Sequence, residues 1–169
     1  LLSVVKTMKA LAAVSIRQYQ KAVDSLRDYN RTVEMGLQIV LKERMGAMLQ
    51  RKTSTMKRMG VIVFGSDQGL CGQLNEQISV FTLDYAKTAG IKKENRKVLS
   101  IGARVADYVE DAGQPVDELL PTPSSTAGIT PLVQEIIMII DEWHFHHNVD
   151  HFFLFYNKYV SGAIYHPHM

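Results

Sequence analysis

The sequence predicts an α/β protein in which a long helix precedes a small open sheet. Residues 1 to about 55 hold no proline and only Gly36 and Gly46 as glycines, and their apolar side chains recur at a helical period. From Met59 onward, short apolar runs alternate with helical segments, the order that forms a mostly parallel sheet covered by helices. Hydrophobic residues make up 46% of the chain and charged residues 21%, which suits a packed core.

The amino-terminal helix carries a heptad seam. When Val5 is set as position a, every a position is apolar or aromatic: Val5, Ala12, Tyr19, Leu26, Val33 and Val40. The d positions are weaker, because Ser15 and Gly36 interrupt them. Such a seam is typical of a helix that pairs lengthwise with another helix. We therefore expect one long coiled-coil-forming helix over residues 1–57, with two shorter helices bent near Gly36 as the alternative.

The remaining residues, 58–169, predict an α/β domain. Three short apolar or aromatic runs are the candidate strands: 61–64, 97–101 and 151–159. Three segments with helical spacing are the candidate helices: 74–89, 102–112 and 131–146. The segment 118–130 is rich in Pro, Ser and Thr and is expected to be a loop. This order predicts a small Rossmann-like open sheet with helices on both faces.

The composition excludes several classes of protein. No window approaches the roughly 18 apolar residues of a membrane helix, and the amino terminus lacks the pattern of a signal peptide. A single cysteine excludes an internal disulfide. Residues 1–58 carry a net charge of +8 and the rest −6, so the two parts are expected to have different partners. The apolar seam argues that the basic helix packs against another helix rather than against nucleic acid.

The loop Gly65–Asn75, GSDQGLCGQLN, is the strongest candidate for a functional site, because a glycine-rich loop between a strand and a helix often binds phosphate. However, no Lys follows the last glycine as in a P-loop, and the glycine spacing differs from that of dinucleotide-binding loops. Asp67 would also repel a phosphate, and the second strand ends without the acidic residue of a dinucleotide site. A small nucleotide-binding protein or enzyme that uses Gly65–Gly72 is therefore the alternative interpretation.

Cys71 and the histidines are weaker candidates. A helix N-terminus could activate the Cys71 thiol, but no base lies near it in sequence, and a small structural cysteine fits better. His147 and His151 are four residues apart, a spacing that suits a metal on one helix. Because the chain must change from helix to strand near Asn148, these two side chains are not expected to share a face, and no metal site is expected.

Three segments resemble the gamma subunit of F-type ATP synthases. KTMKALAAVS, residues 6–15, resembles the family's amino-terminal helix. Its residues TMKALAA resemble an alternative F-type ATPase branch more than the common one. GSDQGLCGQLN resembles the family loop Ser-Ser-Asp-Arg-Gly-Leu-Cys-Gly-Gly-Leu-Asn, and YNKYVS, residues 156–161, is similar to its Tyr-x-x-Phe-x-Ser strand. Gln68 and Gln73 depart from the family's frequent Arg and Gly, and Ser15-Ile16 from a frequent Lys-Met/Leu pair.

The resemblance implies a non-catalytic central-stalk subunit, or rotor, that couples ion-driven rotation to ATP synthesis or hydrolysis. The coupled ion would be a proton or sodium. The implied partners are the alpha and beta subunits of the catalytic hexamer, an epsilon-type subunit and the membrane ring subunits. The protein would lie at the cytoplasmic face of the cell membrane, bound to the membrane only through the complex, with no nucleic-acid partner and no cofactor or metal of its own.

The resemblance also assigns roles to residues. It places a partner interface on the first helix at Lys6, Met8, Lys9, Ala12 and Ala13. It makes a structural strand–helix connection of Ser66, Asp67, Gly69, Leu70, Cys71, Gly72 and Asn75, with Asp67 or Ser66 capping the helix that follows. Family members end in a second long helix that pairs with the first, and this chain stops before it. We therefore expect a truncated chain whose seam dimerises or collapses onto the α/β domain.

Overall fold

The computed structural model describes residues 2–48, 57–162 and 164–169. The chain divides into two compact units. The first unit contains the amino-terminal helix and the segment Ser124–Ile129. The second unit contains the segments Thr55–Pro123 and Thr130–Met169. The predicted domain boundary between residues 57 and 58 stays a prediction.

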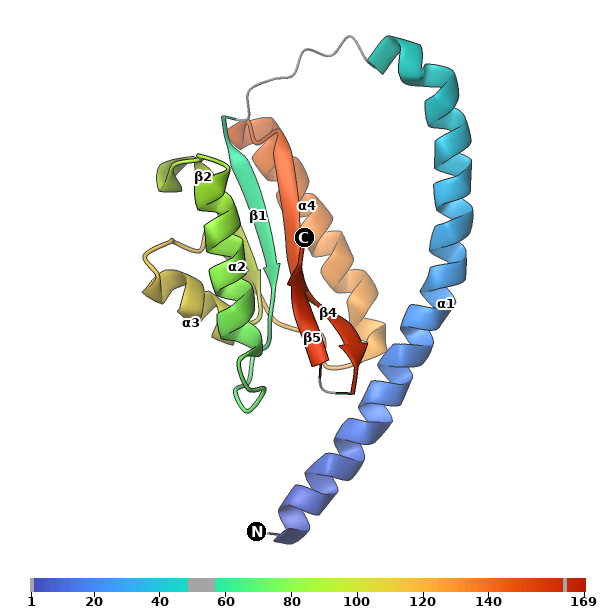
Figure 1. Cartoon of the computed structure of the whole chain (residues 1–169), viewed down its shortest axis with the longest axis vertical. Helices are drawn as coiled ribbons and strands as arrows, with labels where there is room; N and C mark the ends of the chain where they lie inside the picture. Colours follow the sequence, from blue (N-terminus) through green and yellow to red (C-terminus); the bar gives the residue numbers. More distant parts are fainter. Residues whose placement is uncertain (1, 49–56, 163) are drawn as a thin grey trace. The chain divides into compact units, whose positions relative to one another are not determined.

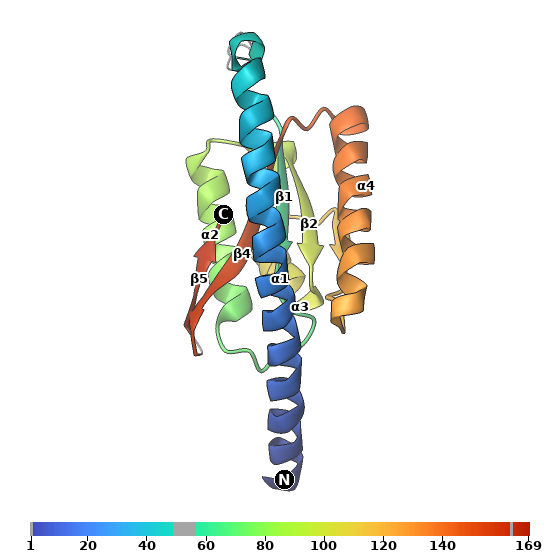
Figure 2. The ribbon, with the colours of Figure 1, turned by 90° about the vertical axis from the view of Figure 1, so that its right-hand side faces the viewer.

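The first unit is built on α1, Leu2–Met48, a single unbroken helix in Figure 2. Its 47 residues span about 70 Å at 1.5 Å per residue. The helix continues through Gly36, so the long-helix prediction is confirmed and the alternative of a break there is wrong. The predicted helical residues 49–55 lie outside the described residues. The seam side chains Val5, Met8 and Leu26 are each more than half exposed.

The second unit is built on a five-stranded sheet with the strand order β3-β2-β1-β4-β5. The strands are β1 (Met59–Phe64), β2 (Arg96–Ile101), β3 (Glu118–Leu120), β4 (His151–Ser161) and β5 (Ile164–His168). The pairs β1–β2, β1–β4 and β2–β3 are parallel, and β4–β5 is antiparallel. The predicted α/β class and the mostly parallel sheet are confirmed.

Sequence reasoning missed two of these strands. β3 lies inside the segment expected to be a loop, and its three residues are too few to show an alternating pattern. β5 contains Pro167, which cannot donate to a ladder and is tolerated because β5 lies at the edge of the sheet. The long strand β4 serves two partners: Met59 to Val63 of β1 pair with its first five residues, and β5 pairs with Tyr156–Ser161.

Helices cover both faces of the sheet, as Figure 1 shows. α2 (Leu74–Thr88) and α3 (Ala103–Asp111) lie on one face, and α4 (Ile129–His147) lies on the other. Two short 3-10 turns, Lys93–Asn95 and Thr126–Gly128, complete the described elements. The central strand β1 divides its side chains between two cores. Met59, Val61 and Val63 pack with α2 and α3, and Ile62 packs with α4 through Ile136 and Trp143.

The parallel strands place their carboxyl ends at one edge of the sheet and their amino ends at the opposite edge. Their carboxyl ends lead into the loop that begins at Gly65 and into the turns at Gly102 and Pro121. Their amino ends begin at Met59, Arg96 and His151 and lie at the opposite edge of the sheet. In open α/β sheets, ligands usually bind at the carboxyl edge.

Candidate functional site

The candidate loop is tied to its neighbours at the carboxyl edge by backbone hydrogen bonds. Gly65 N donates to Ile101 O at 2.9 Å, and Gly102 N donates to Leu120 O at 2.9 Å. Arg104 N, in the first turn of α3, donates to Ser66 O at 2.9 Å. Hydrogen bonds therefore join the carboxyl end of β1 to that of β2, and the carboxyl end of β2 to that of β3.

Gly102 is required at this junction. Its φ angle is +113°, and a Cβ atom there would lie 2.8 Å from backbone atoms of Ser66. An L-residue would be strained in this conformation and would also clash with main chain that cannot move independently. The close approach of the two turns therefore depends on a residue without a side chain.

Asp67 is the central polar contact of the edge. Its Oδ1 accepts from Ala103 N at 3.0 Å, and its Oδ2 accepts from Thr122 N at 2.8 Å and from the Thr122 hydroxyl. Burial favours the neutral acid, but the hydrogen bonds from Thr122 and Ala103 outweigh it and lower the pKa of Asp67 below its ordinary value of 3.8. One carboxylate thus joins the first loop to the turns after β2 and β3.

The expectation that Asp67 or Ser66 caps the following helix is wrong. α2 has Gln73 at its N-cap, without a side-chain hydrogen bond. Asp67 instead receives the N–H of Ala103, the first residue of α3. The sequence could not show this, because the acceptor and the helix that it caps are 36 residues apart.

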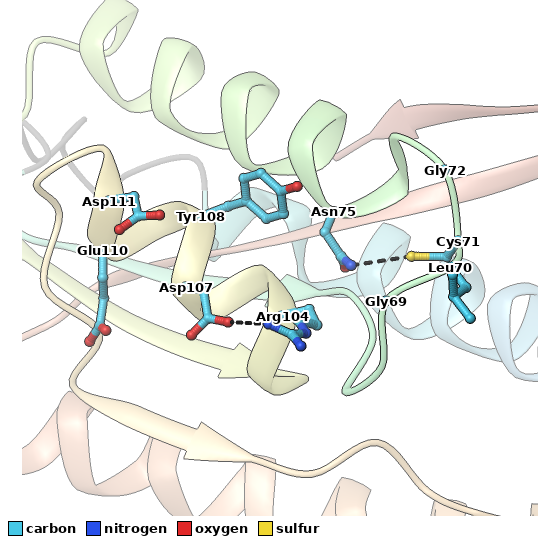
Figure 3. A pocket seen from close by; sticks show the side chains of 10 residues that line it. All are labelled: Gly69, Leu70, Cys71, Gly72, Asn75, Arg104, Asp107, Tyr108, Glu110 and Asp111. Carbon is cyan, nitrogen blue, oxygen red and sulfur yellow. Dashed lines mark hydrogen bonds and ion pairs between the residues drawn. The ribbon is translucent and has the colours of Figure 1, made fainter.

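Ser66, Cys71 and Asn75 close the loop on itself. Asn75 is 3% exposed; its Oδ1 accepts from Ser66 N at 2.9 Å, and its Nδ2 donates to Ser66 Oγ at 2.9 Å. The same amide nitrogen lies 3.3 Å from Cys71 Sγ, the contact drawn in Figure 3. The half-buried thiol contacts the Asn75 amide and the Ser66 hydroxyl, and its role as a structural cysteine stays a prediction.

The tip of the loop presents Leu70. Its φ is +63°, in the left-handed region that disfavours an ordinary side chain by about 1–2 kcal/mol. The side chain is fully exposed, at 103% of its reference area. Gly72, with φ +61°, completes the turn, whereas Gly69 is not in the left-handed region. Sequence reasoning placed Leu70 in a structural connection and did not foresee an apolar side chain displayed at its tip.

A pocket of about 590 Å³ lies between this loop and α3. Gly69 to Gly72 form one wall, and Asp107, Glu110 and Asp111 of α3 are on the other (Figure 3). Arg104 also lines it, but it forms an ion pair with Asp107 at 3.3 Å. The pocket is therefore acidic.

This arrangement does not suit a nucleotide. A phosphate at the carboxyl edge would use free N–H groups at the start of a helix. Here Asp67 already accepts the first N–H of α3, so a carboxylate of the protein occupies the anion position at the start of that helix. The acidic α3 wall would repel a phosphate further. The alternative interpretation of Gly65–Gly72 as a nucleotide loop therefore lacks support from the geometry.

The histidines lie apart from this edge. His144 Nδ1 is 3.0 Å from Val149 O, at the end of α4. His147 is the last residue of α4 and His151 is the first of β4, so the two belong to different elements. Within residues 2–48, 57–162 and 164–169, no group of three His, Cys, Asp or Glu side chains is placed to hold a metal ion.

The predicted interface on α1 consists of exposed side chains. Met8 and Ala12 share the seam with Val5, because four-residue and three-residue steps follow one face of a helix. Lys6, Lys9 and Ala13 lie beside the seam at steps of three and four. Their role as partner contacts stays a prediction.

Comparisons with known proteins identify the family. The family model described as ATP synthase matches residues 1–169, the full chain. The chain belongs to the ATP synthase gamma chain family. It is 28% identical over 166 residues to the ATP synthase gamma chain of Pasteurella multocida, covering 94% of this chain and 55% of that protein. The gamma chains of Nitrosomonas eutropha and Brevibacillus brevis are each 26% identical, over 161 and 165 residues, with 94% of this chain covered in both cases.

The chain spans about half the length of the gamma chains that it matches, 54% and 55% for those of Nitrosomonas eutropha and Brevibacillus brevis. The resemblance noted in the loop and in the first helix is thus confirmed at the level of the family. Among the described residues, none of the helices is long and apolar enough to cross a membrane.

Proposed function

We propose that this chain forms part of the central stalk of an F-type ATP synthase, as a non-catalytic rotor subunit. The observation that carries the proposal is α1, a 47-residue helix with an exposed apolar seam, in a member of the gamma chain family. The α/β unit supports it, because at the edge where such folds usually bind ligands a carboxylate of the protein, Asp67, accepts the first N–H of α3.

The proposed mechanism is mechanical coupling. A second helix pairs with the seam of α1, and the pair turns as an asymmetric axle inside the ring of alternating alpha and beta subunits. Each orientation presents a different face to a given beta subunit. Differential contact then shifts the catalytic sites among their states, as a ligand would. Turning is driven by ion flow, of protons or sodium, through the membrane ring.

The residues proposed to meet the beta subunits are Lys6, Met8 and Lys9, with Ala12 and Ala13 allowing close approach. The amino-terminal 58 residues carry a net charge of +8, and a basic axle is attracted to an acidic surround without being held at one angle.

The remaining partners follow from the same proposal. The α/β unit would contact an epsilon-type subunit and the membrane ring at the foot of the stalk. The protein would thus be peripheral to the cell membrane, on its cytoplasmic face, and would reach the membrane only through the complex. No cofactor is assigned to it.

The test uses the full-length gene product with its native alpha and beta subunits. Complex formation is measured by pull-down, and ATP hydrolysis is measured with and without the gamma chain. We expect a stable complex whose turnover depends on the chain. The double variant Lys6→Gln/Lys9→Gln should lower turnover, whereas Lys87→Gln, a remote lysine in a surface ion pair on α2, should not. Failure to form a complex, together with nucleotide retained by the isolated chain, would overturn the proposal.

A further inference from the structure

The amino-terminal edge of the sheet carries a second pocket, opposite in charge to the one at the carboxyl edge. It has a volume of about 480 Å³ and is lined by Lys57, Arg58, Gly90, Ile91, Lys92 and Asn95. Three of these six residues are cations, and none of the lining residues that the structure describes is a carboxylate. A cavity with this lining attracts anions.

The other cations at this edge are already engaged. Arg96 is 8% exposed and donates to Ile91 O at 2.9 Å and to Ala86 O at 3.1 Å. Lys97 forms an ion pair with Asp117 at 2.7 Å, and Lys93 donates to Gly113 O at 3.0 Å. These three side chains therefore hold the fold together.

The nearby carboxylates line a neighbouring cavity rather than this pocket. A neighbouring cavity of about 210 Å³ includes Glu94 and Asp117 and shares Arg58 and Asn95 with the first. Asp117 already forms an ion pair with Lys97 Nζ and accepts a hydrogen bond from Val98 N at 2.8 Å. Burial lowers the pKa of Arg96 and the charge of Glu94 opposes this shift, so Glu94 lies near the buried guanidinium.

Arg58 is oriented by the fold. Its Nη1 donates to the carbonyl of His147, the last residue of α4, and so satisfies one of the acceptors left open at a helix end. The guanidinium is a rigid fork, so fixing one nitrogen directs the remaining N–H groups. Lys57 and Lys92 are exposed and can reach toward the same ligand, and Asn95 adds an amide donor.

We propose that Lys57, Arg58 and Lys92 form a binding site for a phosphate-bearing group, supplied either as free phosphate or as the headgroup of an anionic phospholipid. Arginine and lysine together are the residue types that proteins use for phosphate oxygens, the first through its fork and the second as a point charge. The site lies on the α/β unit and does not depend on the proposed rotor role of the chain.

Free phosphate is tested on the full chain labelled with ¹⁵N, with inorganic pyrophosphate as the probe. We expect saturable shifts of the backbone amides of Lys92 and Asn95 that weaken with added salt. The variant Lys57→Gln/Lys92→Gln should weaken binding about tenfold or more, because it removes two hydrogen-bond donors that carry a positive charge. Arg58 is left unchanged in this variant because it also supports the end of α4.

The control variant is Lys87→Gln/Lys158→Gln, which removes the same charge from exposed positions outside the pocket. It should bind pyrophosphate like the unmodified chain. The headgroup source is tested by co-sedimentation of the same three proteins with vesicles of phosphatidylcholine that contain phosphatidylglycerol. Loss of vesicle binding in Lys57→Gln/Lys92→Gln but not in the control assigns the site to a headgroup, whereas loss of pyrophosphate binding alone assigns it to free phosphate.

Two results would overturn the proposal. In the first, pyrophosphate does not shift the amides of Lys92 and Asn95, and the binding of pyrophosphate and of vesicles does not depend on Lys57 and Lys92. In the second, the shifts map to α1 and both double variants weaken binding equally, which would show only the attraction of a basic helix for anions.

Discussion

The long helix α1 and the α/β unit differ in what becomes of their apolar side chains. In α1, Val5 and Leu26 are 58% and 57% exposed, whereas Ile62 and Leu99 of the sheet are fully buried. The α/β unit therefore draws its stability from its own two cores. An isolated helix gains little from propensity alone, so α1 depends on a partner that covers its seam. The comparison predicts that substitutions in the two regions have different consequences.

The largest expected effect is that of Gly102→Ala in the α/β unit. The new Cβ would stand 2.8 Å from the Ser66 backbone at a φ of +113°. We expect the free energy of unfolding to fall by about 3 kcal/mol, the sum of left-handed strain and overpacking. Urea denaturation followed by fluorescence of Trp143, the only tryptophan and 2% exposed, reports on this unit.

Gly69→Ala is the matched control for that measurement. Gly69 has a negative-φ backbone, and an added Cβ would meet nothing within 4 Å. Its urea midpoint should stay close to that of the unmodified chain. An unchanged midpoint for Gly102→Ala would show that the two turns are not tightly joined.

The next effect is that of Asp67→Asn. The substitution removes charge-assisted hydrogen bonds to Ala103 and Thr122, and we expect a loss of about 2 kcal/mol in the free energy of unfolding. Asp107→Asn, which breaks only an exposed ion pair with Arg104, should change it by less than about 1 kcal/mol. Equal effects of the two substitutions would contradict the central place of Asp67.

The same carboxylate predicts a dependence on pH. The pKa of Asp67 is lower in the folded chain than its ordinary value of 3.8. Its contribution is therefore complete above that value and is lost as the pH falls through the lower pKa of the folded state. The difference in urea midpoint between the unmodified chain and Asp67→Asn should be constant from pH 6 down to about pH 4 and should narrow as the pH falls further to pH 3. A constant difference down to pH 3 would contradict the assignment.

A smaller effect is expected in α1 from Gly36→Ala. An added Cβ at Gly36 would meet nothing within 4 Å, and alanine is favoured over glycine in a helix interior by about 1 kcal/mol. Helical content measured by far-ultraviolet circular dichroism should rise, while the Trp143 transition stays unchanged. A shift of the Trp143 transition would show that the two regions do not unfold independently.

Leu26→Ala in α1 is also expected to have little effect on the α/β unit. Because Leu26 is 57% exposed, the Trp143 transition should move by less than about 0.5 kcal/mol. The substitution should instead weaken the dimer that we expect the seam to form, as measured by sedimentation velocity at several concentrations. A monomer with an extended shape in small-angle scattering would contradict the expected dimerisation or collapse of the seam.

Periodicity in the sequence was sufficient to predict the long helix, the alternation of strands with helices and the two-sided cover of the sheet. These features depend on residues close together in the chain, whose spacing alone decides which side chains share a face. The short strand β3 and the edge strand β5 could not be found in this way, because each is defined by its neighbour in the sheet rather than by its own pattern.

The sequence by itself determined the fold class, the apolar seam of the long helix and the resemblance to the gamma chains. Only the tertiary structure decided the contacts of the two sheet edges. Asp67 meets Thr122 across 55 residues, and Arg58 meets the carbonyl of His147 across 89. Each partner is an ordinary residue at its own position, and only the parallel strands, whose like ends lie at the same edge, bring them within hydrogen-bonding distance.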